Sequence, residues 1–209
     1  MPRQGRFITI EGTEGAGKTT QTRRLGAALE ATGLPVLATR EPGGAPGAER
    51  LRGLLLAGDV EWSLPAEVLL HFAARAEHVE KTVRPALQAG SWVLCDRFAD
   101  STMVYQGEGQ GADRAMIATL TTMLGLVPDL TLVLDVSVEP SLARLAARGT
   151  PADRYERLGR AFFTRIRNGF RAVAEAAPER CVLIDGEGDA DGVAARMLDA
   201  VRERLGVGR

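Results

Sequence analysis

Five short apolar runs, separated by sequence with a helical pattern, constrain the fold of this chain more than any other feature. They span residues 7–10, 36–39, 92–95, 128–135 and 181–185, and their hydrophobicity is continuous instead of alternating. A strand that is apolar on both faces is covered by other elements on both faces. The sequence therefore predicts an α/β fold, in which helices cover both faces of a five-stranded, mainly parallel sheet.

Helical patterns fill most of the sequence between these runs. A polar, glycine-rich segment at 96–111 precedes the predicted helix at 113–124. The length of 209 residues suits one domain over 1–209, which no repeat or low-complexity linker divides. The predicted helices cover about 17–31, 48–57, 65–88, 113–124, 139–147, 155–176 and 191–205.

The charged residues are almost balanced, with 26 Lys and Arg against 27 Asp and Glu. A chain with a net charge of −1 is not expected to coat nucleic acid or an anionic membrane. Arg outnumbers Lys by 24 to 2, so a lysine that is present despite this preference for Arg is a candidate functional residue. One of the two is Lys18.

The amino-terminal residues lack the apolar stretch and cleavage site of a signal peptide, and no apolar run approaches the ~20 residues that cross a bilayer. We therefore expect a cytoplasmic protein without a membrane partner. Cys95 and Cys181 each lie in an apolar run, far apart and without a CxxC or Cys/His pattern. They are predicted to be buried thiols, and neither metal ligands nor a disulfide.

A glycine-rich segment, Gly12-Thr-Glu-Gly-Ala-Gly-Lys-Thr19, fits the pattern G-x-x-x-x-G-K-[ST] between a predicted strand and a predicted helix. Its glycines let backbone N–H groups surround phosphate oxygens at the helix N-terminus. Lys18 is expected to bridge the β- and γ-phosphates, and the Thr19 hydroxyl to bind Mg²⁺. The residues predicted to bind the phosphates of ATP are Gly12, Glu14, Gly15, Ala16, Gly17, Lys18, Thr19 and Thr20.

This pattern predicts a purine nucleoside triphosphate site in a P-loop NTPase fold, but it leaves the reaction open. A GTPase normally carries an N-K-x-D motif for guanine. The only Asn of this chain, Asn168, is followed by Gly, so the motif is absent. The long repeats of a motor or transporter ATPase are absent as well.

A second group of polar residues is associated with the second and third apolar runs. Glu41 and Pro42 come after the second run, and Arg97 comes soon after the third. His71 and Arg75 are four residues apart on the predicted helix between them, and such residues share a helix face. Arginines, aromatic rings and amide or hydroxyl groups of this kind clamp a second phosphate and hold a flat base. The predicted members are Glu41, Pro42, Arg52, His71, Phe72, Arg75, Asp96, Arg97, Ser101, Thr102, Tyr105 and Gln106.

Four segments, 10–20, 39–44, 96–106 and 128–136, resemble bacterial thymidylate kinases, and the resemblance extends along almost the whole chain. It implies transfer of the γ-phosphoryl group of ATP to dTMP with Mg²⁺, which gives dTDP and ADP on the route to dTTP. It also implies a homodimer that packs through helices.

The resemblance assigns some residues to the acceptor phosphate and the metal. Arg97 and Arg52 would hold the 5′-phosphate of dTMP, and Glu14 would lie near the sugar and this phosphate. Glu41 and Asp96 would support Mg²⁺ and its waters.

Other residues are assigned by the resemblance to the nucleoside. Arg75 and Gln106 would meet the thymine edge, and Ser101 and Thr102 would lie near the base and the phosphate. Tyr105 would crowd the 2′ position of the sugar and so favour deoxyribose.

One position departs from the family. The family usually has a Phe four residues before the equivalent of Arg75, where this chain has His71 followed by Phe72. Either His71 stacks on thymine, or a local shift brings Phe72 onto the base. The nearby Pro42 resembles a family proline that follows a cis peptide bond and would shape its loop against the nucleotide.

The segment 148–156, between two predicted helices, combines Gly and Pro with Arg148 and Arg154. This composition is typical of a lid that closes over ATP and brings an arginine to the transferring group. Some thymidylate kinases carry a catalytic basic residue in the phosphate loop, but positions 13, 14 and 16 here are Thr, Glu and Ala. The chain therefore resembles the lid-arginine kind. The predicted catalytic residues are Lys18, Arg97, Arg154 as the first lid candidate and Arg148 as the second.

Two other functions stay open at the level of sequence. A kinase of the same fold with another monophosphate or a nucleoside as acceptor would share the phosphate loop. A regulatory P-loop ATPase would hydrolyse ATP without an acceptor, or need a protein partner. It would have no use for the group of residues between Asp96 and Gln106.

Overall fold

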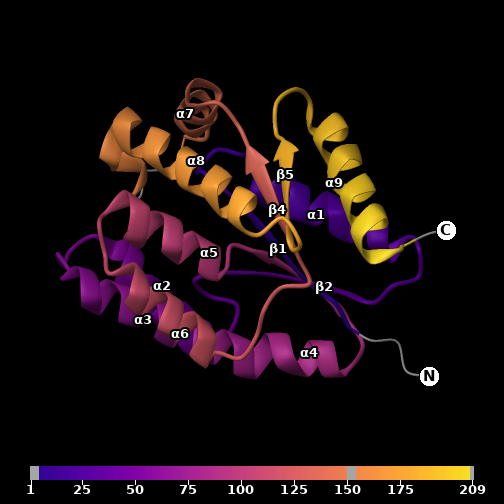
Figure 1. Ribbon diagram of the computed structural model, residues 1–209, viewed down its shortest axis with the longest axis horizontal. Coiled ribbons are helices and arrows are strands. Elements are labelled where there is room, and N and C mark those ends of the chain that lie inside the picture. Colours follow the sequence, from indigo (N-terminus) through magenta and orange to yellow (C-terminus); the bar gives the residue numbers. More distant parts are fainter. Residues whose placement is uncertain (1–4, 150–153, 208–209) are drawn as a thin grey trace.

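The computed structural model describes residues 5–149 and 154–207. Five strands form one sheet in the order β2-β3-β1-β4-β5, and every neighbouring pair is parallel. Each strand lies where an apolar run predicts it, so the predicted fold class is confirmed (Figure 1). The strands are β1 (Phe7–Gly12), β2 (Val36–Arg40), β3 (Trp92–Asp96), β4 (Leu130–Asp135) and β5 (Cys181–Asp185).

Helices connect the strands, and none in the described parts of the chain is both long and apolar enough to cross a membrane. Wider, π-helical turns form η1 (Val79–Val83) and η2 (Met103–Gly109), and a tighter turn forms η3 (Glu156–Leu158). The α-helices are α1 (Lys18–Glu30), α2 (Pro46–Ala57), α3 (Leu64–His78), α4 (Arg84–Gln88), α5 (Ala99–Thr102), α6 (Arg114–Met123), α7 (Val138–Ala147), α8 (Gly159–Ala176) and α9 (Ala190–Leu205).

Different helices cover the two faces of the sheet. Ile8 and Leu132 are buried on one face, in a cluster with side chains of α1 and α9. Phe7 and Val133 belong to clusters on the other face, which include side chains of η1 and α8. Figure 1 shows α1 and α9 on one side of the sheet and α8 on the other. The strands are therefore covered in the way that their continuous hydrophobicity predicts.

The helix predicted over 65–88 exists as one continuous segment, α3–η1–α4, with a wider turn in its middle. Pro85 has no N–H to donate, and its ring crowds the carbonyl four residues back. Just before it, the Arg84 N–H reaches the Val79 carbonyl, five residues back. The wider turn accommodates the proline without ending the helix.

Most of the polar, glycine-rich segment at 96–111 is helical, because residues 99–109 form α5 and η2. Glycine is common in turns, so helical structure is unexpected in a segment with several glycines. In the structure Gly109 allows η2 to pack against α8. A Cβ on Gly109 would lie 2.7 Å from atoms of Ile166 and of Phe162.

Parallel pairing brings the carboxyl ends of the strands to one edge of the sheet. Ile10 of β1 and Arg40 of β2 both pair with Asp96 of β3. Gly12, at the end of β1, pairs with Leu134 of β4. The glycine-rich loop and the segments after β2 and β3 therefore begin side by side, where ligands bind to sheets of this kind.

Candidate active site

The phosphate loop runs from Gly12, at the end of β1, to Lys18, at the start of α1. Gly17 precedes α1 in the left-handed conformation, with a φ of 93°. The buried Lys18 Nζ donates to the Thr13 carbonyl oxygen at 2.7 Å. Burial and the charge of Arg97 lower the pKa of Lys18 to about 8, against the opposite effect of nearby carboxylates. The loop therefore gathers positive charge at the N-terminus of a helix, which favours a phosphate.

A cleft opens beside this loop and takes in most of the residues predicted for the ATP phosphates. Ala16 lies instead in an adjoining hollow, which it lines with Arg144 and the loop after β5. The Gly12 carbonyl accepts a hydrogen bond from Arg97. The cleft is lined by Glu14, Gly15, Gly17, Lys18, Thr19, Thr20, Arg40, Glu41, Arg52, Asp96, Arg97, Arg144, Leu145, Ala147 and Arg148.

Two of the three predicted metal residues meet in the cleft. The Thr19 hydroxyl donates to Asp96 Oδ2 at 2.7 Å. Hydroxyl and carboxylate oxygens are the hard ligands that Mg²⁺ prefers, so this pair fits the ion. Glu41 uses both of its oxygens elsewhere, since Oε2 accepts from Arg75 and Oε1 lies 2.9 Å from His78 Nδ1. A role of Glu41 at the metal stays a prediction.

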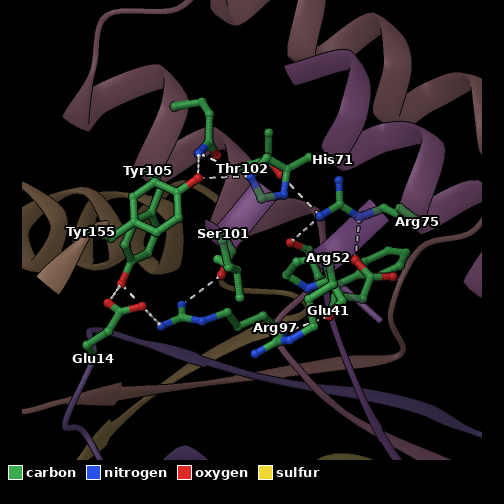
Figure 2. Close-up of a pocket in the computed structure, with 14 residues that line it drawn as sticks. Glu14, Glu41, Arg52, His71, Arg75, Arg97, Ser101, Thr102, Tyr105 and Tyr155 are labelled. Carbon is green, nitrogen blue, oxygen red and sulfur yellow. Dashed lines mark hydrogen bonds and ion pairs between the residues drawn. The ribbon is translucent and has the colours of Figure 1, made fainter. Parts of the chain in front are cut away.

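A second pocket adjoins the cleft at Glu14, Glu41, Arg52 and Arg97, which line both (Figure 2). Glu14 and all the predicted members of the second group line this pocket, except Phe72 and Asp96, and Asp96 lines the cleft. Figure 2 shows Glu14 and Arg97 toward one end and His71 and Arg75 toward the other. The lining residues are Glu14, Glu41, Pro42, Arg52, Leu56, His71, Arg75, Arg97, Phe98, Ser101, Thr102, Tyr105, Gln106 and Tyr155.

Arg97 connects the phosphate loop to the pocket. Its Nη1 donates to the Gly12 carbonyl oxygen and to Ser101 Oγ, both at 3.0 Å. Its Nη2 donates to Glu14 Oε1 at 2.7 Å. The guanidinium also lies over the Tyr105 ring, 4.9 Å from its centroid. One side chain thus contacts β1, the phosphate loop and the helical segment after β3.

The backbone of Arg97 is held in an unfavourable conformation. Among the described residues it is the only non-glycine with a positive φ, 73°, which costs on the order of 1 kcal/mol. The Arg97 N–H donates to the Ile10 carbonyl oxygen at 2.9 Å. The buried Glu11 accepts from the Phe98 N–H at 2.8 Å and from the Ser101 hydroxyl at 2.6 Å. Hydrogen bonds on both sides of Arg97 therefore stabilise the strained residue.

Glu14 supplies the counter-charge of Arg97. Burial raises the pKa of Glu14, but the charges of Arg97 and Lys18 and the hydrogen bond from Tyr105 outweigh it, so the pKa ends below its ordinary value. The Tyr105 hydroxyl donates to the second oxygen, Oε2. Glu14 is therefore ionised at neutral pH, and an anion that enters the pocket competes with it for Arg97.

Arg75 is fixed at the opposite end of the pocket. Its Nε donates to Glu41 at 2.6 Å, and its Nη2 donates to the Phe98 carbonyl at 2.9 Å and to Thr102 Oγ1 at 3.1 Å. Within the described residues, the buried Nη1 has no hydrogen-bond partner. A buried donor without a partner is costly, so this group indicates a ligand acceptor in the pocket.

His71 and Phe72 occupy different environments. His71 lines the pocket, whereas Phe72 packs in a separate apolar cluster and contacts Arg75. His71 Nε2 lies 3.1 Å from the Tyr155 hydroxyl. Burial, with the charge of Arg75, lowers the pKa of His71 to about 3, so the ring is neutral at ordinary pH. Of the two candidates for stacking, His71 is the one beside the pocket.

The two lid candidates lie on different sides of the site. Arg154 Nη2 pairs with the buried Glu67 at 2.9 Å, and Arg148 lines the cleft beside the phosphate loop. Residues 150–153 of the predicted lid lie outside the described residues. The catalytic roles of both arginines stay predictions.

Besides lining residues such as Leu56, Phe98 and Arg144, the sequence did not indicate four buried side chains whose polar groups contact predicted residues of the site. The helix spacing that grouped His71 with Arg75 also includes Glu67, four residues before His71, and places His78 three residues after Arg75. A glutamate inside an apolar strand is unusual, and this signal would have found Glu11. The missed residues are Glu11, Glu67, His78 and Tyr155.

Comparisons with known proteins all match this chain to thymidylate kinases. The family model described as Thymidylate kinase matches residues 10–196. The thymidylate kinase of Caulobacter vibrioides is 50% identical, over 98% of this chain and 99% of the relative. That of Gluconobacter oxydans is 49% identical, over 99% of each. The crystal structure of thymidylate kinase from Ehrlichia chaffeensis is 33% identical, with a TM-score of 0.78, and covers 95% of this chain and 99% of that one.

The neutral, buried His71 predicts a pH dependence of stability. Below pH 6.5, the ordinary pKa, the unfolded chain binds a proton that the folded chain does not, so stability is complete above this pH and falls below it. Between pH 7.5 and 5 this residue is expected to cost about 2 kcal/mol. Urea unfolding of His71→Phe should therefore show a smaller pH dependence than the wild type. An equal pH dependence of the two proteins would contradict a neutral His71.

Proposed function

The chain belongs to the thymidylate kinase family and phosphorylates dTMP to dTDP with ATP, and we propose that Arg97 brings the two nucleotides together. One observation carries this proposal. Arg97 donates hydrogen bonds both to Gly12 of the phosphate loop and to Ser101 of the second pocket. Phosphates on the two sides of this guanidinium would both lie within its reach.

The 5′-phosphate of dTMP is proposed to replace Glu14 as the partner of Arg97. A guanidinium binds carboxylate and phosphate oxygens with the same forked geometry, so this exchange keeps its hydrogen bonds. Arg52 lines both the pocket and the cleft, and its Nη1 donates to the Pro42 carbonyl at 2.7 Å. It is proposed as the second cation on the acceptor phosphate. The peptide bond between Glu41 and Pro42 in this loop is cis, as the resemblance predicts.

The nucleoside of dTMP is proposed to fill the rest of the pocket. The unpartnered Nη1 of Arg75 would donate to a carbonyl oxygen of thymine, and Gln106 would meet the same edge of the base. His71 is proposed to stack on the thymine ring. Tyr105 is held by Glu14 and lies beside Arg97, where it would crowd the 2′ position of the sugar.

ATP is proposed to lie along the cleft with its phosphates at the N-terminus of α1. Lys18 would contact the β- and γ-phosphates. The adenine is proposed to occupy the adjoining hollow, which Arg144 and the loop after β5 line. Thr19 and Asp96 would hold Mg²⁺, which when bound neutralises charge on the phosphates.

The proposed reaction is an in-line attack by an oxygen of the dTMP phosphate on the γ-phosphorus of ATP. Phosphate oxygens are largely ionised near neutral pH, so no general base is needed and no covalent enzyme intermediate forms. Lys18 and Arg97 would stabilise the charge of the transition state. Arg154, or else Arg148, would add a third positive charge.

We also propose that the protein is a cytoplasmic homodimer. Apolar side chains are exposed on adjacent helices: Leu54 on α2 is 51% exposed, Leu69 on α3 is 49% exposed, and Met123 on α6 is 77% exposed. Figure 1 shows these three helices together, away from α9 and the edge strand β5. A surface of this kind supports packing through helices.

An acceptor screen tests the proposed substrate site. Purified protein with ATP is offered dTMP, dUMP, dCMP, dGMP or thymidine, and the products are identified by mass. The proposal expects dTDP as the main product. Preferred phosphorylation of another monophosphate or of thymidine would favour a different acceptor, and ATP hydrolysis without any acceptor would favour a regulatory ATPase.

Arg97→Ala is expected to lower kcat/KM for dTMP by about a thousandfold or more, because the variant loses both the acceptor contact and charge stabilisation. The affinity for ATP, measured by calorimetry, should change little. Arg202→Ala removes an exposed arginine that pairs with Asp199 on α9, and it serves as the control with normal turnover. Near-normal turnover of Arg97→Ala would show that the acceptor phosphate binds elsewhere.

Leu69→Glu places a charge in the proposed dimer surface and is expected to convert a dimer into a monomer, because an unpaired buried charge is costly. Analytical ultracentrifugation measures the mass. Leu183→Glu, on the edge strand β5, is the matched control and should remain dimeric. A monomeric wild type, or a Leu69→Glu variant that stays dimeric, would count against this surface.

A further inference from the structure

Glu67 is a buried carboxylate that none of the roles above uses. Its side chain, near the start of α3, is 0% exposed. Its Oε1 accepts from Gln106 Nε2 at 2.8 Å, and from the Tyr155 hydroxyl and Gln110 Nε2, both at 2.9 Å. Arg154 pairs with its Oε2. Burial raises the pKa of Glu67, but these partners outweigh it and leave the pKa below its ordinary value.

An ionised Glu67 fixes the orientation of the Gln106 amide. A carboxylate only accepts hydrogen bonds, so the Gln106 group that faces it is the NH₂ group. The Tyr155 hydroxyl gives its single proton to Glu67, so its 3.1 Å contact with Gln106 also uses an N–H of this group. Both amide protons are therefore directed to Glu67 and Tyr155. Among the described residues the Gln106 Oε1 has no partner, and Gln106 lines the pocket.

The same reasoning fixes the His71 ring. Because the Tyr155 oxygen has no proton left to give, we infer that His71 Nε2, 3.1 Å away, donates to it and does not accept from the more distant Gln106 Nε2, at 3.4 Å. A neutral imidazole has only one N–H, so its Nδ1 is an acceptor. Figure 2 shows the Tyr155 hydroxyl directed toward His71. Glu67 thus determines the proton positions of two residues that line the pocket.

The pocket consequently offers a base one fixed pattern, with a donor at Arg75 Nη1 and an acceptor at Gln106 Oε1. Thymine has the complementary pattern, because a carbonyl oxygen stands next to its N3–H. Cytosine carries no proton on N3, so its lone pair would face the Gln106 oxygen. Two acceptors in contact leave both without a hydrogen bond, which a buried site does not tolerate.

We propose that Glu67 is a positioning residue that selects the base of the acceptor. By binding the NH₂ group of Gln106, it keeps the amide carbonyl toward N3 and so favours bases that are protonated there. This proposal rests on the proposed placement of the dTMP base beside Arg75 and Gln106. It assigns specificity to a residue that does not itself line the pocket.

The test compares dTMP with 5-methyl-dCMP, which has the same methyl group and differs only at the N3 and C4 edge. Glu67→Gln keeps the size of the side chain but can also donate, so Gln106 is free to turn its NH₂ group toward the base. The ratio of kcat/KM for dTMP to that for 5-methyl-dCMP is expected to fall about tenfold or more. The ratio for dTMP to dUMP, which both carry the N3 proton, should stay the same.

Glu61→Gln, at an exposed position before α3, is the matched control and should keep the wild-type ratios. The proposal would be overturned if the Glu67→Gln enzyme were slower on every acceptor but kept its preference for dTMP over 5-methyl-dCMP. In that case the role of Glu67 would be only structural. A wild-type enzyme without this preference would instead overturn the placement of the base, and the proposal with it.

Circular dichroism shows whether the Glu67→Gln variant folds. If the variant does not fold, NMR of the wild-type protein tests the proposal. The chain has two histidines, so the ¹⁵N chemical shifts of the His71 ring are readily assigned. The proposal expects a neutral ring protonated at Nε2. Protonation at Nδ1 would show that Glu67 does not order the hydrogen bonds of the pocket, and would overturn it.

Discussion

The partly buried pairing of Arg97 with Glu14 is the contact on which the rest of the site depends. Burying two charges is costly, and the pair compensates for this only where further hydrogen bonds satisfy both groups. Gly12 and Ser101 provide these bonds to Arg97, and Tyr105 provides one to Glu14. In our proposal the substrate phosphate takes the place of the carboxylate. Arg97 then keeps an anionic partner throughout, and the pocket need not be rebuilt when the substrate binds.

The fold supplies the rigidity that this exchange requires. The neighbouring parallel strand β1 holds the backbone at Arg97 in its left-handed conformation, because Ile10 accepts from the Arg97 N–H and Glu11 accepts from the next N–H, that of Phe98. Strain of this kind persists only where the surroundings determine the conformation. At the far end of the pocket, Glu41 and Glu67 have the same function for Arg75 and for Gln106. Buried carboxylates therefore position side chains of the pocket at both ends: Glu11 holds Ser101, and Glu41 and Glu67 hold Arg75 and Gln106.

The sequence predicted the five strands, the phosphate loop and nearly all the residues that line the second pocket. The strands and the position of the glycine-rich loop could be predicted because strand hydrophobicity and motif spacing are local properties of the chain, whereas the roles of the pocket residues stay predictions. The helical character of 99–109 was not predictable in this way, because Gly109 is required by contact with α8, a helix distant in sequence. Glu67 was missed for a similar reason. Its partners Gln106 and Tyr155 come from segments that only the fold brings together.

A crystal structure of the wild-type protein with dTMP and a non-hydrolysable ATP analogue tests the central claim most directly. The account predicts that Arg97 contacts an oxygen of the dTMP phosphate, that Glu14 has moved away from Arg97, and that the γ-phosphate lies in line with the attacking oxygen. An intact pair of Arg97 and Glu14 in this complex, with the dTMP phosphate bound elsewhere, would contradict it.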